Sequence, residues 1–173
     1  SLLIRAVLAM IIEFGNDEVY YWTYAMYPDW SHFDHPPMVG WLIQLFSCNL
    51  LFDSEFFLRL SSIIFMTINT YLVFLIGRQV KNEQTGFYAA LLYTASIYAF
   101  VITGIFILPD TPLSIFTLLA VLQFVKYFQY EKNKHLLLAG LFTGLAMLSK
   151  YSGVFVWVGV GLYVIIYARK EFK

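Results

Sequence analysis

Six acidic or histidine side chains fall within one stretch near the start of the chain, between Gly15 and Pro37. The stretch opens with Asp17 and Glu18, directly after an apolar run. Acidic residues in such a place can cap a helix, because they favour the unpaired N–H groups of its first turn. A carboxylate there can also act as a general base. The two interpretations are compatible, since a cap would hold the carboxylate still.

The densest polar cluster is His32 to His35, which two prolines follow. Two imidazoles and a carboxylate within four positions make Asp34 and His35 candidate ligands for a divalent metal ion. The alternative is a polar turn, because each proline fixes its own φ and restricts the preceding residue. No HExxH pattern accompanies the cluster. Cys48 is the only cysteine, which excludes an internal disulfide and a cysteine-based zinc site.

Three further charged residues stand in apolar surroundings: Arg59, Asp110 and Lys150. A charged group near hydrocarbon is costly, so each is a candidate functional residue that could bind substrate. The alternative for Arg59 and Lys150 is a side chain that reaches out to the lipid headgroups. Asp110 lies between two prolines, and the alternative for it is a helix N-cap with Pro112 in the first turn.

The composition shows what kind of solvent must surround these groups. Of the 173 residues, 60% are hydrophobic and only 13% are charged, and the mean hydropathy is +0.70. Soluble domains carry about 25% charged residues, and one core of this size could not bury so much apolar surface. The formal net charge is zero, so nucleic acid is not an expected partner. These values predict an all-α integral membrane protein built as a multi-spanning helical bundle.

The apolar segments give the expected order of helices. The first run, 2–14, is shorter than the roughly 20 residues that span a bilayer. The run 38–52 is also short and is predicted to lie at the interface, in the first outer loop. The predicted spans are 56–77, 86–108, 111–128, and a pair of helices within 136–168 that the cluster Ser149–Gly153 divides.

The positions of lysine and arginine predict the orientation of these spans. Basic residues favour cytoplasmic loops, and here they cluster on alternate loops: Arg78 and Lys81; Lys126, Lys132 and Lys134; Arg169, Lys170 and Lys173. The loop 15–37, Asp110 and Lys150 then lie together on the opposite, outer face. We expect an active site facing the periplasm or exterior, most simply at a bacterial inner membrane.

Aromatic and small residues have simpler expected roles. The first outer loop is rich in tryptophan and tyrosine, which form belts at membrane interfaces; they are Tyr20, Tyr21, Trp22, Tyr24, Tyr27 and Trp30. Gly140 and Gly144 form a small-xxx-small pair that predicts helix packing.

Taken in order, the polar motifs resemble those of a known family. The motifs are Asp17-Glu18 with Tyr20-Tyr21, Asp34-His35-Pro36-Pro37, Phe57-Leu58-Arg59-Leu60, Pro109-Asp110-Thr111-Pro112 and Leu148-Ser149-Lys150-Tyr151. This set is similar to the N-terminal part of the GT-C glycosyltransferases, in the protein-mannosyltransferase-like group that includes the aminoarabinose transferases. The resemblance implies a membrane enzyme that transfers a sugar, with inversion, from a polyprenyl-phosphate carrier to a protein, lipid or glycan acceptor.

The resemblance also implies roles for individual residues. Asp17 corresponds to the catalytic base of the first outer loop, with Glu18 beside it. Asp34 and His35 align with an acidic-basic pair near the metal and the lipid phosphate, and histidine stands where the aminoarabinose branch has lysine. Arg59, His35 and Lys150 are the candidate cations for the leaving phosphate, because positive charge there would lower the barrier.

The expected unit is therefore residues 1–173 as the N-terminal transmembrane part of a longer enzyme, inactive by itself. Two alternatives belong to other classes: a transporter or channel fragment, and a non-catalytic membrane subunit. Transporters place paired charges and broken helices near the middle of the bilayer, whereas the charged groups here are predicted near one interface.

Overall fold

The computed structural model describes residues 2–167, and helices make up its regular structure. Arg169, Lys170 and Lys173, the last predicted basic cluster, lie outside the described residues. The short helices at one end are α1 (Leu2–Ile11), α2 (Asn16–Met26), α3 (Met38–Phe46) and α4 (Glu55–Leu58). The longer ones are α5 (Leu60–Val80), α6 (Glu83–Ala95), α8 (Asp110–Tyr130), α9 (Asn133–Ser149) and α10 (Phe155–Tyr167). The π-helix η1 (Tyr98–Ile102), α7 (Thr103–Ile105) and the 3-10 turn η2 (Tyr151–Val154) join them.

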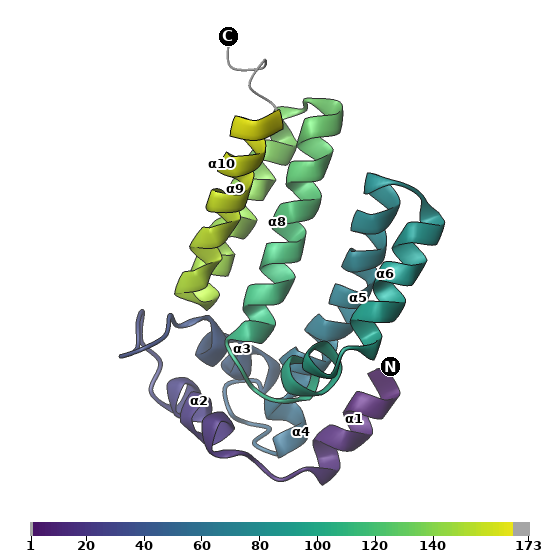
Figure 1. Cartoon of the computed structure of the whole chain (residues 1–173). Helices are drawn as coiled ribbons and strands as arrows, with labels where there is room; N and C mark the ends of the chain where they lie inside the picture. The colour runs from purple at the N-terminus through teal and green to yellow at the C-terminus, as the bar shows by residue number, and fades with distance from the viewer. Residues whose placement is uncertain (1, 168–173) are drawn as a thin grey trace.

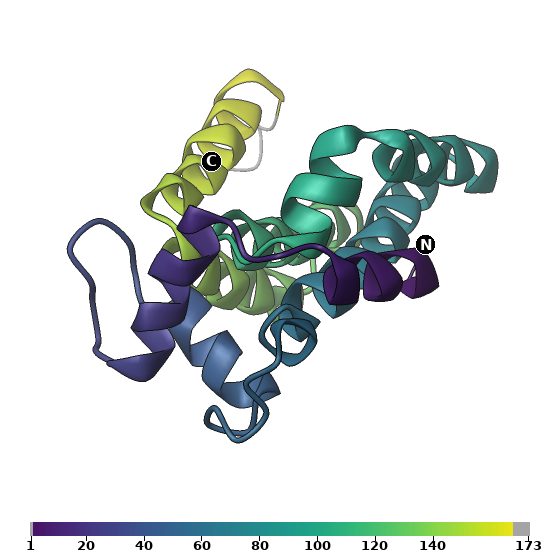
Figure 2. The ribbon, with the colours of Figure 1, turned by 90° about the horizontal axis from the view of Figure 1, so that it is seen from below.

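The helices form two layers of different character (Figure 1). The long helices run roughly alongside one another: α5 packs against α6 and α8, and α8 packs against α9. The short helices α1 to α4 lie across one end of this bundle, as the view from that end shows (Figure 2). The prediction of interfacial helices in the first loop agrees with this arrangement.

Two helices are long and apolar enough to cross a membrane, α5 and α8. A third crossing is possible if α6 and the segment Tyr98–Ile105 count as one span. The fold is thus that of an all-α membrane protein. The predicted division of the last apolar stretch is confirmed, because α9 ends at Ser149 and α10 begins at Phe155.

The segment predicted as the span 86–108 forms a bent pair of helices, not one continuous helix. The chain turns by 73° between α6 and Tyr98–Ile105. Ser96 leaves helical geometry with a ψ of 125°, and a π-helix follows. Neither proline nor glycine marks this position in the sequence, so local composition could not reveal it. Arg5 of α1 contacts this segment: its guanidinium donates to Phe100 O (3.3 Å) and Ala99 O (3.4 Å).

The interfacial helix predicted over 38–52 is also too long. It ends at Phe46, and the next residues turn back on themselves. Cys48, Asn49 and Leu50 have φ values of 53°, 60° and 64°, in the left-handed region. Non-glycine residues occupy that region at a cost, and a run of three ends any right-handed helix. Ser47 supports the turn by accepting a hydrogen bond from Leu50 N through its hydroxyl (2.9 Å).

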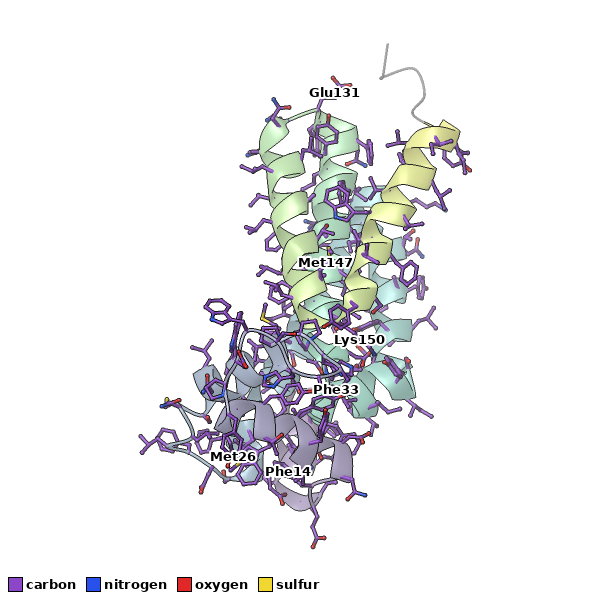
Figure 3. All side chains as sticks on the ribbon, turned by 90° about the vertical axis from the view of Figure 1, so that its left-hand side faces the viewer. Phe14, Met26, Phe33, Glu131, Met147 and Lys150 are labelled. Carbon is purple, nitrogen blue, oxygen red and sulfur yellow. The ribbon has the colours of Figure 1, made fainter. Side chains whose placement is uncertain are left out.

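The polar residues separate toward the two ends of the bundle. Lys150 lies toward the end that carries Phe14, Met26 and Phe33, and Glu131 lies at the other end (Figure 3). Glu131 belongs to the same α8–α9 connection as Lys132. The basic clusters within residues 2–167 therefore lie away from the predicted site residues, as the charge pattern predicts.

Close helix contact occurs at glycines other than the predicted ones. A Cβ on Gly77 would lie 2.7 Å from Gly86 Cα, so these two residues let α5 and α6 touch. A Cβ on Gly140 or Gly144 would meet nothing within 4 Å. The expected packing role of Gly140 and Gly144 is therefore not realised against any part of the chain that the structure describes.

This difference predicts opposite effects of the same substitution. Gly86→Ala should destabilise the protein by about 1–3 kcal/mol, because the added methyl group meets the backbone of α5. Gly144→Ala is the matched control; it should be neutral or stabilising, since alanine favours a helix by up to about 1 kcal/mol over glycine. Unfolding in one detergent would measure both. Equal losses for the two variants would contradict the α5–α6 contact.

Candidate active site

A buried ion pair between Glu18 and Arg59 connects the short helices to the bundle. Arg59 Nε donates to Glu18 Oε1 at 2.8 Å, and Nη2 donates to Oε2 at 2.6 Å. Arg59 is fully buried and Glu18 nearly so. The two residues are 41 positions apart in the sequence, at the first turn of α2 and the junction of α4 with α5. Such bidentate pairs fix the orientation of both side chains.

Every donor of Arg59 has a partner. Besides Glu18, the guanidinium donates to the carbonyls of Ala9 (3.0 Å), Ile12 and Glu13 (3.1 Å). These carbonyls belong to the last turn of α1 and the residues after it, where helices leave such groups unpaired. Five N–H groups thus meet five hydrogen bonds. Arg59 has no donor left for a phosphate, which speaks against its predicted role as a cation for the leaving group.

The carboxylate of Glu18 is equally saturated. Oε1 also accepts from Ile107 N at 3.0 Å, and Oε2 also accepts from Gly15 N at 3.1 Å. Four hydrogen bonds occupy the roughly four lone-pair positions of a carboxylate. Gly15 is the N-cap of α2, so Asp17 lies in the first turn and is not the capping residue. Glu18 provides that contact from inside the helix and has no free oxygen for catalysis.

Asp17 has a different environment although it is the next residue. It lies on the exposed side of the first turn of α2. Within residues 2–167, it takes part in no ion pair. The saturated Glu18 therefore holds the backbone of this turn, while the neighbouring side chain of Asp17 is exposed.

Asp34 receives hydrogen bonds from two tyrosines of α2. Tyr20 Oη donates to Oδ1 at 2.8 Å, and Tyr24 Oη donates to the same oxygen. His35 Nδ1 lies 3.1 Å from Oδ2, although its geometry is not that of a hydrogen bond. His32 stacks on the Tyr24 ring with centroids 3.6 Å apart. These contacts fold the loop back over α2.

These contacts bear on the candidate metal site. Both Asp34 oxygens already face other polar groups, and the described residues contain no group of three His, Cys, Asp or Glu side chains placed to bind a metal ion. The pair Asp34 and His35 by itself therefore does not fit a metal centre.

The hydrogen bonds predict the acid sensitivity of the loop. Hydrogen bonds, foremost from Tyr24, lower the pKa of Asp34 from 3.8 to about 2. Because the folded pKa lies below the ordinary value, the stabilisation by Asp34 should be complete above about pH 4 and lost as the pH falls toward 2. Tyr24→Phe should raise this pKa toward 3.8, whereas Tyr27→Phe should not. Carboxyl NMR titration would measure both, and an unchanged pKa in Tyr24→Phe would exclude this hydrogen bond.

Asp110 and Lys150 form the third pair. Lys150 Nζ lies 3.0 Å from Oδ1 and 2.9 Å from Oδ2 of Asp110. The pair joins the first residue of α8 to the residue after α9, and both side chains are partly exposed. Asp110 makes no capping hydrogen bond, so the N-cap interpretation is wrong. Lys150 is accessible from the surface and holds its charge next to a carboxylate.

Tyr21 connects these groups. Burial, together with the negative charges of Asp34, Asp17 and Asp110, raises the pKa of Tyr21 to about 12. The charges of all three carboxylates therefore act on one phenol of α2. Tyr21 also packs edge-on against His35, with centroids 5.5 Å apart. The sequence suggested an interfacial belt for Tyr21 and included it in the family motif, but it did not indicate the contact with His35.

The sequence-predicted residues thus form three pairs and one free carboxylate. The pairs are Glu18 with Arg59, Asp34 with His35, and Asp110 with Lys150. The free carboxylate is Asp17. All of them come from elements at the same end of the bundle (Figure 1).

Comparison with known proteins identifies the family of the chain. The sequence profile of the dolichyl-phosphate-mannose-protein mannosyltransferase family matches residues 34–173. The chain belongs to this family. Within the family match lie Asp34, His35, Arg59, Asp110 and Lys150, whereas Asp17 and Glu18 precede it.

One curated relative extends the comparison toward the N-terminus. The chain is 27% identical over 155 residues to the lipid A galacturonosyltransferase RgtD of Rhizobium johnstonii. The match covers 89% of this chain but 32% of the relative, so the chain spans about a third of the length of that protein. No solved structure matches the chain.

Proposed function

We propose that the protein is a membrane glycosyltransferase that moves a sugar from a polyprenyl-phosphate carrier to an acceptor hydroxyl at the outer face of the membrane. The main support for this proposal is that Asp17 takes part in no ion pair within residues 2–167. In a site where Glu18, Asp34 and Asp110 each have a cationic or hydrogen-bonding partner, Asp17 is the carboxylate left free to accept a proton. Membership of the mannosyltransferase family supports the reaction class.

In the proposed reaction, Asp17 takes the proton of the acceptor hydroxyl while its oxygen attacks the anomeric carbon. The bond between that carbon and the phosphate oxygen breaks, and its electron pair leaves with the polyprenyl phosphate. Attack from the side opposite the leaving group inverts the anomeric centre. A positioned base of this kind contributes about 10²–10⁴-fold to the rate.

The leaving phosphate gains negative charge and needs a cation. Lys150 is the best candidate, because it is accessible and its only described ionic partner is a carboxylate that a phosphate could replace. His35, which packs edge-on against Tyr21, is the second candidate for a contact with the phosphate. Arg59 is not proposed to bind the phosphate. Its proposed role is to hold Glu18 and, through Glu18, the helical turn that contains Asp17.

The position of the site fits a lipid-linked donor. The proposed residues lie where the apolar helices meet the layer of short helices, so a carrier tail could stay in lipid while its sugar remains in water. The relative acts on lipid A by its name, and we propose a lipid acceptor of that kind. A transporter would need charge pairs near the middle of the bilayer, and the three pairs lie at one end instead.

The donor class can be tested with the full-length protein in liposomes. Polyprenyl-phosphate sugars carrying mannose, aminoarabinose or galacturonic acid would be offered, with the matching nucleotide sugars as controls. Transfer from a polyprenyl-phosphate sugar with inverted product is the expected result. Transfer from nucleotide sugars alone, or transport of the sugar without bond cleavage, would overturn the proposal.

Lys150 gives a second, residue-level prediction. Lys150→Gln should lower turnover by about 10²-fold, because one electrostatic contact to the developing charge is lost. Lys150→Arg should keep part of the activity, since it keeps the charge. Lys132→Gln, at the opposite end of the bundle, is the matched control and should be near normal. Equal activity of Lys150→Gln and Lys132→Gln would remove Lys150 from the site.

A further inference from the structure

An apolar groove of about 650 Å³ lies between the first outer loop and the half of α9 that is nearer to Lys150. The loop residues that line it are Trp30, Ser31, Pro36 and Pro37. Leucines, Met147 and two glycines of α9 line the opposite wall. A Cβ on Gly140 or Gly144 would meet nothing within 4 Å. The two glycines therefore leave open space in the groove that a larger side chain would occupy.

The loop wall of this groove is held by contacts with two helices. Tyr20 and Tyr24 of α2 donate hydrogen bonds to Asp34 of the loop. Trp30 packs edge-on against Trp41 of α3, with ring centroids 5.4 Å apart. In a membrane, an apolar chain gains no hydrophobic free energy by leaving lipid for a protein groove, so its binding depends on close packing. A loop held from both sides provides the fixed shape that such packing needs.

The groove extends from the level of the interface into the apolar layer. Trp30 and Tyr151 line it and are exposed, and such residues favour the depth of the lipid headgroups. The lining continues along α9 to Gly140, 11 residues before Tyr151, which corresponds to about 16 Å along a helix. Met147 lies farther into the bundle than Lys150 (Figure 3). An amphiphile with its headgroup near Tyr151 would therefore place an apolar chain in the groove.

The position of the groove favours the acceptor over the donor as its occupant. The loop that forms one wall directly follows α2, which contains Asp17, and the proposed base must reach the acceptor hydroxyl. No residue of α8, a helix that the structure describes in full, lines this groove. A separate groove of about 750 Å³ between α8 and α10 includes Leu113 and Ser152, which closely follow Asp110 and Lys150 in the sequence. A donor bound at that pair therefore has apolar space of its own.

We propose that the groove between the first outer loop and α9 binds an acyl chain of the lipid acceptor, and that Gly140 and Gly144 determine acceptor specificity by leaving room for the chain. The proposal rests on the proposed function, because a lipid acceptor and the base Asp17 are taken from it. It adds the place where the chain of the acceptor binds and the two residues that set its size.

Filling the groove in the full-length protein tests this proposal. Gly144→Leu should raise the KM for lipid A by about 10–200-fold, the range over which hydrophobic pockets discriminate one methylene group. The KM for the polyprenyl-phosphate donor should change little. Gly161→Leu is the matched control, because a Cβ on Gly161 also meets nothing within 4 Å and Gly161 lines neither groove. Equal KM values of the two variants for lipid A, or a raised KM for the donor in Gly144→Leu, would overturn the proposal.

A binding measurement without donor separates this proposal from the proposed function. Lipid A with a photoreactive group in one acyl chain should label α9 of the wild-type protein and of Gly161→Leu, and labelling of Gly144→Leu should be much weaker. Excess polyprenyl phosphate should not compete. If this labelling is seen but no sugar is transferred from polyprenyl phosphate, the proposed function fails while the acyl-chain groove stands.

Two results of the labelling experiment would contradict the groove itself. Competition by polyprenyl phosphate would mean that the carrier tail occupies it. Absence of labelling on α9 in the wild-type protein would mean that another part of the full-length chain or a second copy covers it. Because both results come from the wild-type protein, they decide even if Gly144→Leu does not fold.

Discussion

Replacing Asp17 with asparagine should reduce sugar transfer by the full-length protein about 10²–10⁴-fold, with little effect on folding. Asparagine keeps the size of the side chain but cannot accept the proton of the acceptor, and a positioned base contributes a factor of this order. Folding should be unaffected because Asp17 is exposed and lies outside the network of Glu18. The decisive measurement is turnover at saturating donor and acceptor, together with binding of polyprenyl phosphate, which should remain normal.

The control for this experiment is Asp53→Asn. Asp53 is an exposed carboxylate in another loop at the same end of the bundle, just before α4. The substitution removes the same charge without touching the proposed base. If Asp17→Asn and Asp53→Asn lower turnover equally, the effect comes from surface charge, and Asp17 is not the base. A bell-shaped or acid-limited pH profile that disappears in Asp17→Asn would further identify the titrating group.

Replacing Arg59 with methionine should destabilise the protein by about 3–5 kcal/mol, the cost of removing one partner from a buried ion pair. The loss is large because Glu18 would remain buried with a charge that only two backbone N–H groups still contact. The carbonyls of Ala9, Ile12 and Glu13 would lose their donor as well. Unfolding in detergent, followed by tryptophan fluorescence, would measure the loss.

Two further variants make this prediction specific. Arg59→Lys should rescue little, because an ammonium offers three donors in place of a fork of five. Arg78→Gln is the matched control for loss of an arginine: Arg78 is half exposed, and its nearest carboxylate oxygen, on Glu83, is 4.0 Å away. A surface pair of this kind contributes about 0–1 kcal/mol. If Arg59→Met is no less stable than Arg78→Gln, the buried network does not hold the site together.

The two predictions separate neighbouring residues that look alike in the sequence. Asp17 and Glu18 are adjacent carboxylates, and both were candidates for catalysis. The structure gives Glu18 four hydrogen bonds and full burial, so its loss should appear as a loss of stability. Asp17 has none of these contacts, so its loss should appear as a loss of rate. Comparing stability and turnover for Asp17→Asn and Glu18→Gln tests this division directly.

Some features of the protein could be predicted because they depend on composition and on local chain preferences. The excess of apolar residues requires lipid as the solvent, which in turn requires helices that satisfy their own backbone groups. The division at Ser149–Gly153 was visible because a polar cluster interrupts an apolar run. The separation of Lys132 from Lys150 along the bundle followed from alternating loops and needed no tertiary contact.

Other features could not be read locally because distant residues create them. The break after Ser96 has no proline or glycine to mark it, and it is stabilised by Arg5, 94 and 95 positions away from its partners. Arg59 looked like a free cation near the interface until the fold brought three carbonyls and Glu18 around it. Tyr21 looked like one aromatic residue among many, and only the loop closing over α2 placed His35 against it.

A group of acidic and histidine residues lies near the start of the chain, between Gly15 and Pro37. Their types and order, by themselves, determined that a polar surface should form at one end of an apolar helical bundle. Which of the carboxylates is free was decided by the tertiary structure, because hydrogen-bond saturation depends on how many donors the fold brings within reach. Glu18 accepts four hydrogen bonds, whereas the side chain of Asp17, the preceding residue, is exposed at the surface.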